Sequence, residues 1–140
     1  MGFFGTYAFE HGRWITLPEA ERPPLVEPFL WMNILNSDFT EVVYAPAGPG
    51  TGVAYLGQTP RAYFGYPEAS APTDPDREAE GLAAWSGRAA AEIRGYLAED
   101  DPEDTWLGKS GNDDPAEWLV EIKTARLLTA LGLPLPTELR

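Results

Sequence analysis

The chain contains no cysteine and only one histidine among its 140 residues. Without cysteine there is no disulfide, no thiolate nucleophile and no zinc or iron–sulfur site built on thiolates. A single histidine excludes the HExxH zinc motif and the two-histidine facial triad, so the residues indicate neither a metal site nor a cofactor. His11 falls in an expected turn and no serine lies in a GxSxG elbow, so a serine hydrolase triad is not indicated either.

Cations and long apolar runs are also scarce. The 10 basic residues stand against 22 acidic ones, which gives a net charge of −12. Such a chain lacks the excess of cations with which proteins bind nucleic acid or anionic membranes. No apolar run approaches the roughly 20 residues that a membrane span requires, and the first residues do not resemble a signal peptide. These absences predict a cytoplasmic protein that binds neither nucleic acid nor membrane.

The aromatic and acidic residues are distributed unevenly along the chain. Hydrophobic residues make up 44% of it, an ordinary value for a globular protein, and the length suits one domain over residues 1–140. Thirteen of the 17 aromatic residues lie in the first 66 positions, and 15 of the 22 acidic residues lie between Glu68 and Glu121. We therefore expect residues 1–66 to form mainly strands and the acidic second half to be largely helical.

The first half is expected to form a mainly antiparallel sheet of four to six strands. Glycine, proline and the Asn36-Ser37-Asp38 cluster punctuate segments that are rich in aromatic and β-branched residues. Residues 29–35 are apolar at nearly every position, which favours a central strand covered on both faces. The expected strands are residues 3–10, 13–17, 29–35, 39–45 and 53–56, with a further strand at 61–66, while the proline-rich stretch 18–28 interrupts the pairing.

Two helices are expected after a loop at residues 67–75. Asp74-Pro75 supplies a capping carboxylate and a proline suited to the first helical position, which predicts a helix over residues 75–98 with a kink near Gly87. The same device recurs at Asp114-Pro115.

This second start predicts a helix over residues 115–131 that ends at Gly132, and an acidic loop over 99–113 joins the two helices. The predicted class is therefore α+β, with two principal C-terminal helices packed on the antiparallel sheet.

Two surfaces suggest a protein partner. The last helix has apolar residues on two opposed faces, and one sheet cannot cover both. The second of these faces either packs under the chain's own elements or forms a homodimer or partner interface. The acidic run that precedes the helix is either a solvated loop or a docking patch for a basic partner. The residues that would contact a partner are Glu99, Asp100, Asp101, Glu103, Asp104, Val120, Leu127 and Leu131.

The first interpretation is therefore a non-enzymatic acidic interaction or regulatory domain of the inhibitor or immunity type. The alternative is a small-molecule-binding protein or small hydrolase with an aromatic-lined pocket and a buried carboxylate. Glu27 and Glu41 are the carboxyl groups expected to be desolvated, because their neighbours in the sequence are apolar. The residues of this alternative pocket are Trp14, Glu27, Trp31, Glu41, Tyr44 and Tyr55.

Overall fold

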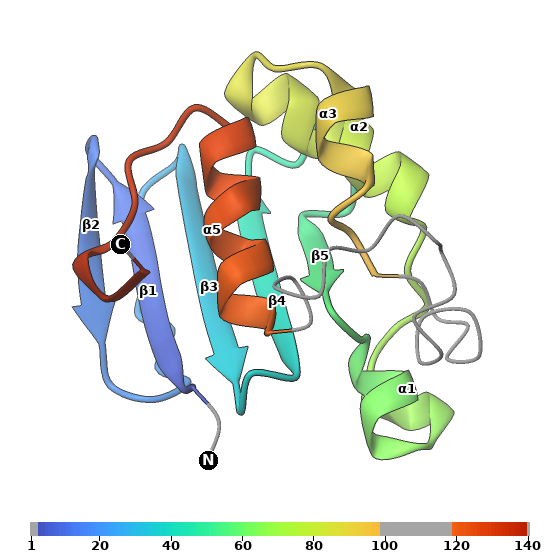
Figure 1. Ribbon diagram of the computed structural model, residues 1–140. Helices are drawn as coiled ribbons and strands as arrows, with labels where there is room; N and C mark the ends of the chain where they lie inside the picture. The colour runs from blue at the N-terminus through green and yellow to red at the C-terminus, as the bar shows by residue number, and fades with distance from the viewer. Residues whose placement is uncertain (1–2, 99–118, 140) are drawn as a thin grey trace.

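The computed structural model describes residues 3–98 and 119–139 and shows an α+β fold built on a five-stranded antiparallel sheet (Figure 1). This confirms the fold class predicted from the sequence. The strand order is β2-β1-β3-β4-β5. The strands are β1 (Gly5–Glu10), β2 (Arg13–Leu17), β3 (Phe29–Leu35), β4 (Phe39–Ala45) and β5 (Val53–Leu56). The helices are α1 (Pro60–Phe64), α2 (Pro75–Ser86), α3 (Ala90–Arg94) and α5 (Val120–Ala130), with short 3-10 helices η1 (Pro67–Ala69) and η3 (Thr137–Leu139).

Successive side chains along each strand point to opposite faces of the sheet, and different elements pack against the two faces. Tyr7 pairs with Met32, and Met32 pairs with Val42, so these three residues share one face. Helices α2, α3 and α5 cover this face, and α5 crosses in front of β3 and β4 (Figure 1). The sheet contributes Tyr7, Leu30, Met32, Ile34, Val42, Tyr44, Ala54 and Leu56 to the resulting core.

The proline-rich segment between β2 and β3 lies against the opposite face. The backbone N–H of Ala20 donates to Thr6 Oγ1 over 2.8 Å. The indole N–H of Trp31 donates to the carbonyl of Glu21, also over 2.8 Å, and the guanidinium carbon of Arg22 lies 5.7 Å from the centre of a Trp31 ring. Both faces of β3 are thus covered, which explains why nearly all of its residues are apolar.

Residues 61–66 do not form the further strand that their aromatic composition suggested. They belong to α1 and the turn after it, because helix-capping signals flank the segment. Thr59 Oγ1 accepts a hydrogen bond from the N–H of Ala62, proline stands in the first turn, and Gly65 ends the helix at φ 78°. These local signals prevail over β-propensity, and the ring of Tyr63 packs 5.0 Å from that of Phe39.

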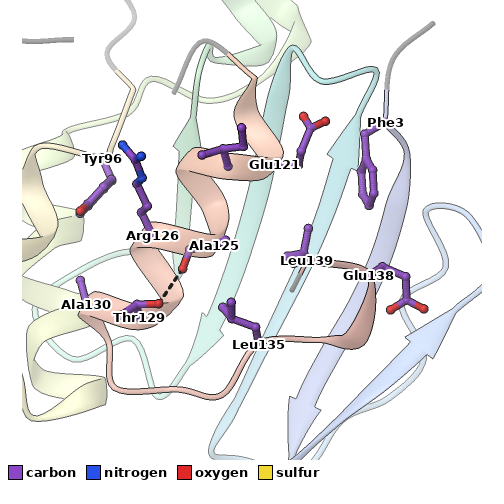
Figure 2. A pocket seen from close by; sticks show the side chains of 11 residues that line it. Phe3, Tyr96, Glu121, Ala125, Arg126, Thr129, Ala130, Leu135, Glu138 and Leu139 are labelled. Atoms are coloured by element: carbon purple, nitrogen blue, oxygen red, sulfur yellow. Dashed lines mark hydrogen bonds between the residues drawn. The ribbon is translucent and has the colours of Figure 1, made fainter. Parts of the chain in front are cut away.

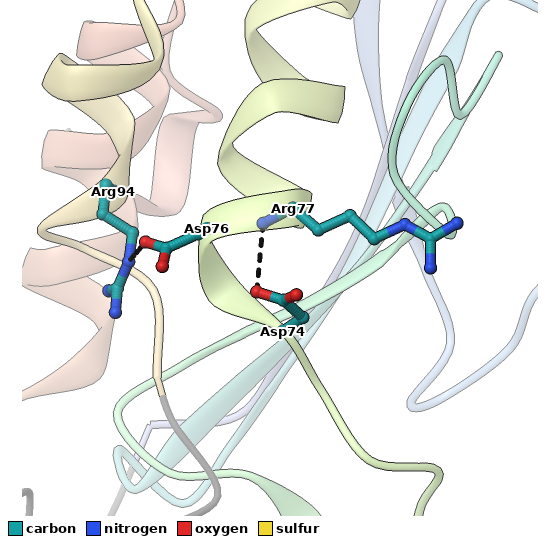
Figure 3. A network of polar contacts seen from close by, with 4 residues as sticks. All are labelled: Asp74, Asp76, Arg77 and Arg94. Carbon is teal, nitrogen blue, oxygen red and sulfur yellow. Dashed lines mark hydrogen bonds and ion pairs between the residues drawn. The ribbon is translucent and has the colours of Figure 1, made fainter.

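The helix expected over residues 75–98 is divided into α2 and α3. Gly87 takes φ 76° after α2, and its N–H donates to the carbonyl of Ala83. At the other end of α2, Asp74 Oδ1 accepts a hydrogen bond from the N–H of Arg77 over 3.2 Å, as its position before proline predicts (Figure 3). Asp76 and Arg94 form an exposed ion pair between α2 and α3, which adds at most about 1 kcal/mol to stability.

Helix α5 is joined to the β3–β4 hairpin and to the sheet. The N–H of Val120 donates to the carbonyl of Ser37 over 3.1 Å, and the buried hydroxyls of Thr40 and Thr124 lie 2.8 Å apart. Gly132, at φ 78°, follows the helix as predicted. The expected helix start at residues 114–115 and the acidic loop over 99–113 lie outside the described residues. Within residues 3–98 and 119–139, no helix has the length and apolar character of a membrane span.

Candidate functional site

A groove of about 740 Å³ runs over the outward side of α5 (Figure 2). Its wall is mainly apolar, and it is assembled from segments that are far apart in the sequence. Phe3 comes from the residues before β1, Tyr96 follows α3, and the C-terminal segment contributes η3 and the residues before it. The lining residues are Phe3, Tyr96, Glu121, Ile122, Ala125, Arg126, Thr129, Ala130, Leu135, Glu138 and Leu139.

Glu121 lies on the Phe3 side of α5 in this groove (Figure 2). Its Oε2 accepts a hydrogen bond of 3.1 Å from the hydroxyl of Ser37. That hydroxyl in turn accepts the backbone N–H of Phe3 over 2.7 Å. Glu121 Oε1 is closed off from solvent and has no hydrogen-bond partner among the residues that the structure describes. One oxygen of this carboxylate is therefore withdrawn from solvent without a hydrogen-bond donor.

A tight turn holds Ser37 in this position. Asn36 and Ser37 take φ values of 53° and 58°, and the N–H of Asp38 donates to the carbonyl of Leu35 over 2.9 Å. Two successive left-handed residues in a two-residue connection are typical of the turns that suit the twist of a hairpin. The sequence cluster at residues 36–38 predicts this turn, but it does not predict the contact with Glu121.

The groove also contains a second carboxylate. Burial, and then the charge of Glu138, raise the pKa of Tyr7 to about 12. Tyr7 lies beneath the C-terminal segment on the helix-covered face, so the negative charge of Glu138 is close enough to disfavour ionisation of the Tyr7 hydroxyl. Two carboxylates and one guanidinium, that of Arg126, thus line a mainly apolar wall.

Three of the residues predicted to contact a partner lie away from the groove. Val120, Leu127 and Leu131 are buried in the chain's own core, at 0 to 2% exposure, where β4, β5 and α3 contact α5. The chain thus covers this face of the helix itself, the first of the two alternatives that the sequence left open, and the face offers no exposed surface. The five acidic residues Glu99, Asp100, Asp101, Glu103 and Asp104 lie outside the described residues.

The six residues of the alternative pocket do not converge. Trp14 and Tyr44 belong to the helix-covered face, and the indole of Trp14 donates to the carbonyl of Pro134. The opposite face holds Trp31, Glu41 and Tyr55, of which the two aromatic residues are buried. Glu41 is half-buried, and burial raises its pKa against the opposing charge of Arg22. Glu27 is exposed in the segment between β2 and β3.

Glu78 of α2 is a fully buried carboxylate, at 1% exposure, and the sequence analysis did not predict it. The hydroxyl of Tyr44 donates to its Oε1 over 2.6 Å, and the hydroxyl of Thr51 donates to its Oε2 over 2.8 Å. The N–H of Thr51 lies 3.0 and 3.1 Å from the two oxygens. Because donors of this chain occupy both oxygens, Glu78 fixes the loop after β4 to α2. A signal was available, since Glu78 lies one turn before Leu82 on the core-facing stripe.

His11 is exposed in the β1–β2 turn, with φ 53°. Among the described residues, no group of three histidine or acidic side chains is arranged to hold a metal ion. The groove over α5 is therefore the candidate site. Comparison of the chain with protein-family models, with curated proteins and with solved structures finds no match.

Proposed function

We propose that the protein is a non-enzymatic cytoplasmic interaction domain, of the regulatory or inhibitor type, that binds an apolar and positively charged segment of a partner protein in the groove over α5. The observation that carries the proposal is the composition of the groove. Phe3, Ile122 and Leu139 supply apolar surface. The two carboxylates of the groove, Glu121 and Glu138, outnumber its one cation, Arg126. Burial of apolar side chains gives such a complex its affinity, and opposite charge gives it selectivity and a fast encounter.

The charge of the whole chain supports a basic partner. A net charge of −12 attracts cationic segments and repels a second copy of the same chain. The acidic run that begins at Glu99 follows the groove residue Tyr96 by three positions in the sequence. The partner proposed here is therefore another protein, in preference to self-association.

Three labelled peptides of equal length test this proposal by fluorescence anisotropy. They share the same leucine and phenylalanine positions, and their remaining positions are lysine, glutamine or glutamate. The lysine peptide should bind most tightly, and its affinity should fall as salt rises, because a Debye length of about 10 Å at 0.1 M salt screens exposed charges. Equal binding of the lysine and glutamate peptides, or no binding of the lysine peptide, would contradict the proposal.

A pair of variants locates the binding surface. Ala125→Arg places a long cation in the groove and should weaken the lysine peptide by about tenfold or more. Ala91→Arg makes the same change on the exposed side of α3 and should leave binding unchanged. Thermal unfolding of both variants shows whether they remain folded. If both substitutions weaken binding equally, the peptide does not bind in the groove.

The volume of the groove favours one alternative occupant, a small apolar amine. Ligand sites of drug-sized molecules occupy about 300–1,000 Å³, and the groove at about 740 Å³ falls within this range. The hydrolase form of this alternative has less support, because donors of the chain itself occupy both oxygens of the buried carboxylate Glu78. Binding of a small amine to a protein that binds none of the three peptides would favour the alternative.

A further inference from the structure

The charged groups of the groove are separated across α5. Glu121 and Arg126 are five residues apart in the helix, so their side chains leave its axis about 140° apart. Arg126 lies on the same side as Tyr96, whereas Glu121 lies on the side of Phe3 (Figure 2). Glu138, from η3, also lies on the Phe3 side. The groove therefore has one flank with a cation and one flank with two carboxylates.

The two carboxylates differ in what a ligand can reach. Glu121 Oε1 is shielded from solvent, and Oε2 of the same residue already accepts the Ser37 hydroxyl. Glu138 is exposed, and its carboxylate forms no hydrogen bond or ion pair with another residue in the described ranges 3–98 and 119–139. A bound cation can therefore contact Glu138, while Glu121 contributes only its charge at longer range.

The ridge of α5 between these flanks is apolar. Ile122 and Ala125 project between the two flanks, and Leu139 follows Glu138 in η3. The aliphatic stem of a lysine or arginine can pack on this surface while its charged end reaches the exposed carboxylate. On the other flank the same cation meets the guanidinium of Arg126, and like charges repel. A cation is thus favoured on one side of the helix only.

We propose that the partner segment crosses α5 in one direction, with a basic residue beside Glu138 and an uncharged or acidic residue beside Arg126. This inference rests on the proposed function and adds the charge pattern of the bound segment. Glu138 is the specificity-determining carboxylate, and Arg126 keeps a second cation away from the Tyr96 side. A partner of this kind carries its basic and its non-basic residues at opposite ends of a short apolar stretch.

Two peptides with the same apolar centre test the direction. One carries lysine near its N-terminus and glutamate near its C-terminus, and the other exchanges these two residues. A nitroxide label is attached at either end, and paramagnetic broadening of methyl signals is followed in the isotope-labelled full chain. A label at the lysine end should broaden Leu139, on the Glu138 side, more than Ala130, on the Tyr96 side. A label at the glutamate end should reverse this order, in both peptides.

Charge variants identify the residues responsible. Glu138→Gln should weaken both peptides by about two- to fivefold, the range of an exposed ion pair. Glu80→Gln removes the same charge from an exposed position of α2 outside the groove and should leave both affinities unchanged. Glu121→Gln should have a smaller effect than Glu138→Gln, because its oxygens are not open to the ligand. Arg126→Gln should strengthen a peptide with lysine at both ends, and thermal unfolding shows whether each variant is folded.

The outcomes separate this inference from the proposed function. Equal broadening of both methyl groups by either label would overturn the direction while leaving the groove as a binding surface. A direction that follows the peptide N-terminus in place of its lysine would overturn it as well. A larger loss in Glu121→Gln than in Glu138→Gln would show that the cation lies at the wrong carboxylate. If neither peptide binds, the inference and the proposed function fail together.

Discussion

Replacing Gly81 by alanine tests how closely the Tyr44–Glu78 junction is packed. A Cβ atom at Gly81 would lie 2.2 Å from the hydroxyl of Tyr44, 2.9 Å from the carbonyl of Ala47 and 3.0 Å from the Cα of Gly50. The hydroxyl has little freedom to move aside, because it is buried and donates to Glu78 over 2.6 Å. The new methyl group must therefore displace either the tyrosine or the loop.

Opposing contributions determine the size of this effect. Helix propensity alone would make alanine more favourable than glycine by about 1 kcal/mol. Displacing the tyrosine hydroxyl removes a hydrogen bond to a carboxylate, worth about 1.5–3 kcal/mol, and overpacking adds about 1–3 kcal/mol. The free energy of unfolding of Gly81→Ala should therefore fall by about 1.5–5 kcal/mol.

Urea denaturation followed by circular dichroism measures this change against a matched control. Gly95 also has a right-handed helical backbone, and nothing lies within 4 Å of a Cβ placed there. Gly95→Ala should therefore keep the stability of the unchanged protein or gain up to about 1 kcal/mol. In a Tyr44→Phe background the nearest clashing atom is absent, so Gly81→Ala should be less destabilising. The reasoning is refuted if Gly81→Ala is as stable as the unchanged protein.

Three further predictions concern titration and buried hydroxyls. Burial raises the pKa of Glu41, so the fold loses stability as the pH rises through that pKa. Glu41→Gln should accordingly stabilise the protein at pH 7 and have little effect below about pH 4, and a lower urea midpoint at pH 7 would contradict this. Tyr7 titrates near 12 instead of its ordinary 10.0 because of burial and the charge of Glu138, so stability should fall between these pH values, and less steeply in Tyr7→Phe. Replacing only Thr40 or only Thr124 by valine should cost about 1–3 kcal/mol, because the other buried hydroxyl loses its partner, whereas the double variant should cost clearly less than the sum of the two in a double-mutant cycle.

Local chemistry explains why much of the fold is predictable. Residues 13–17, 29–35, 39–45 and 53–56 form strands with the predicted bounds, because turn residues end each segment and alternation sets its faces. The capping pair Asp74-Pro75 likewise marks the start of α2. The error at residues 61–66 has the same origin, since two local signals conflicted there. The caps at Thr59 and Gly65 outweighed the aromatic composition between them.

The candidate site could not be predicted in this way, because it depends on which distant residues meet. The groove joins Phe3, Tyr96, α5 and Leu139, and no local pattern brings these together. Strand register separates the aromatic residues that the sequence grouped as one pocket, since adjacent positions point to opposite faces. Apolar neighbours in the sequence are also a poor guide to which carboxyl group is buried. Apolar neighbours in the sequence pointed to Glu27, which is exposed, whereas helical periodicity places Glu78 in the core.

Glu78 and Glu121 show that the role of a carboxylate here depends on its remaining acceptor capacity more than on its charge. The hydroxyl of Tyr44 and both donors of Thr51 satisfy Glu78, so its charge is used within the fold. Glu121 receives one hydrogen bond from the described residues and lines an apolar groove. Glu78 therefore has both oxygens satisfied, whereas Glu121 Oε1 is shielded from solvent and has no donor among the described residues, which is unfavourable for a buried acceptor. Two carboxylates of equal charge thus differ in what they contribute to the fold, since Glu78 joins a loop to α2 while Glu121 keeps one acceptor without a donor.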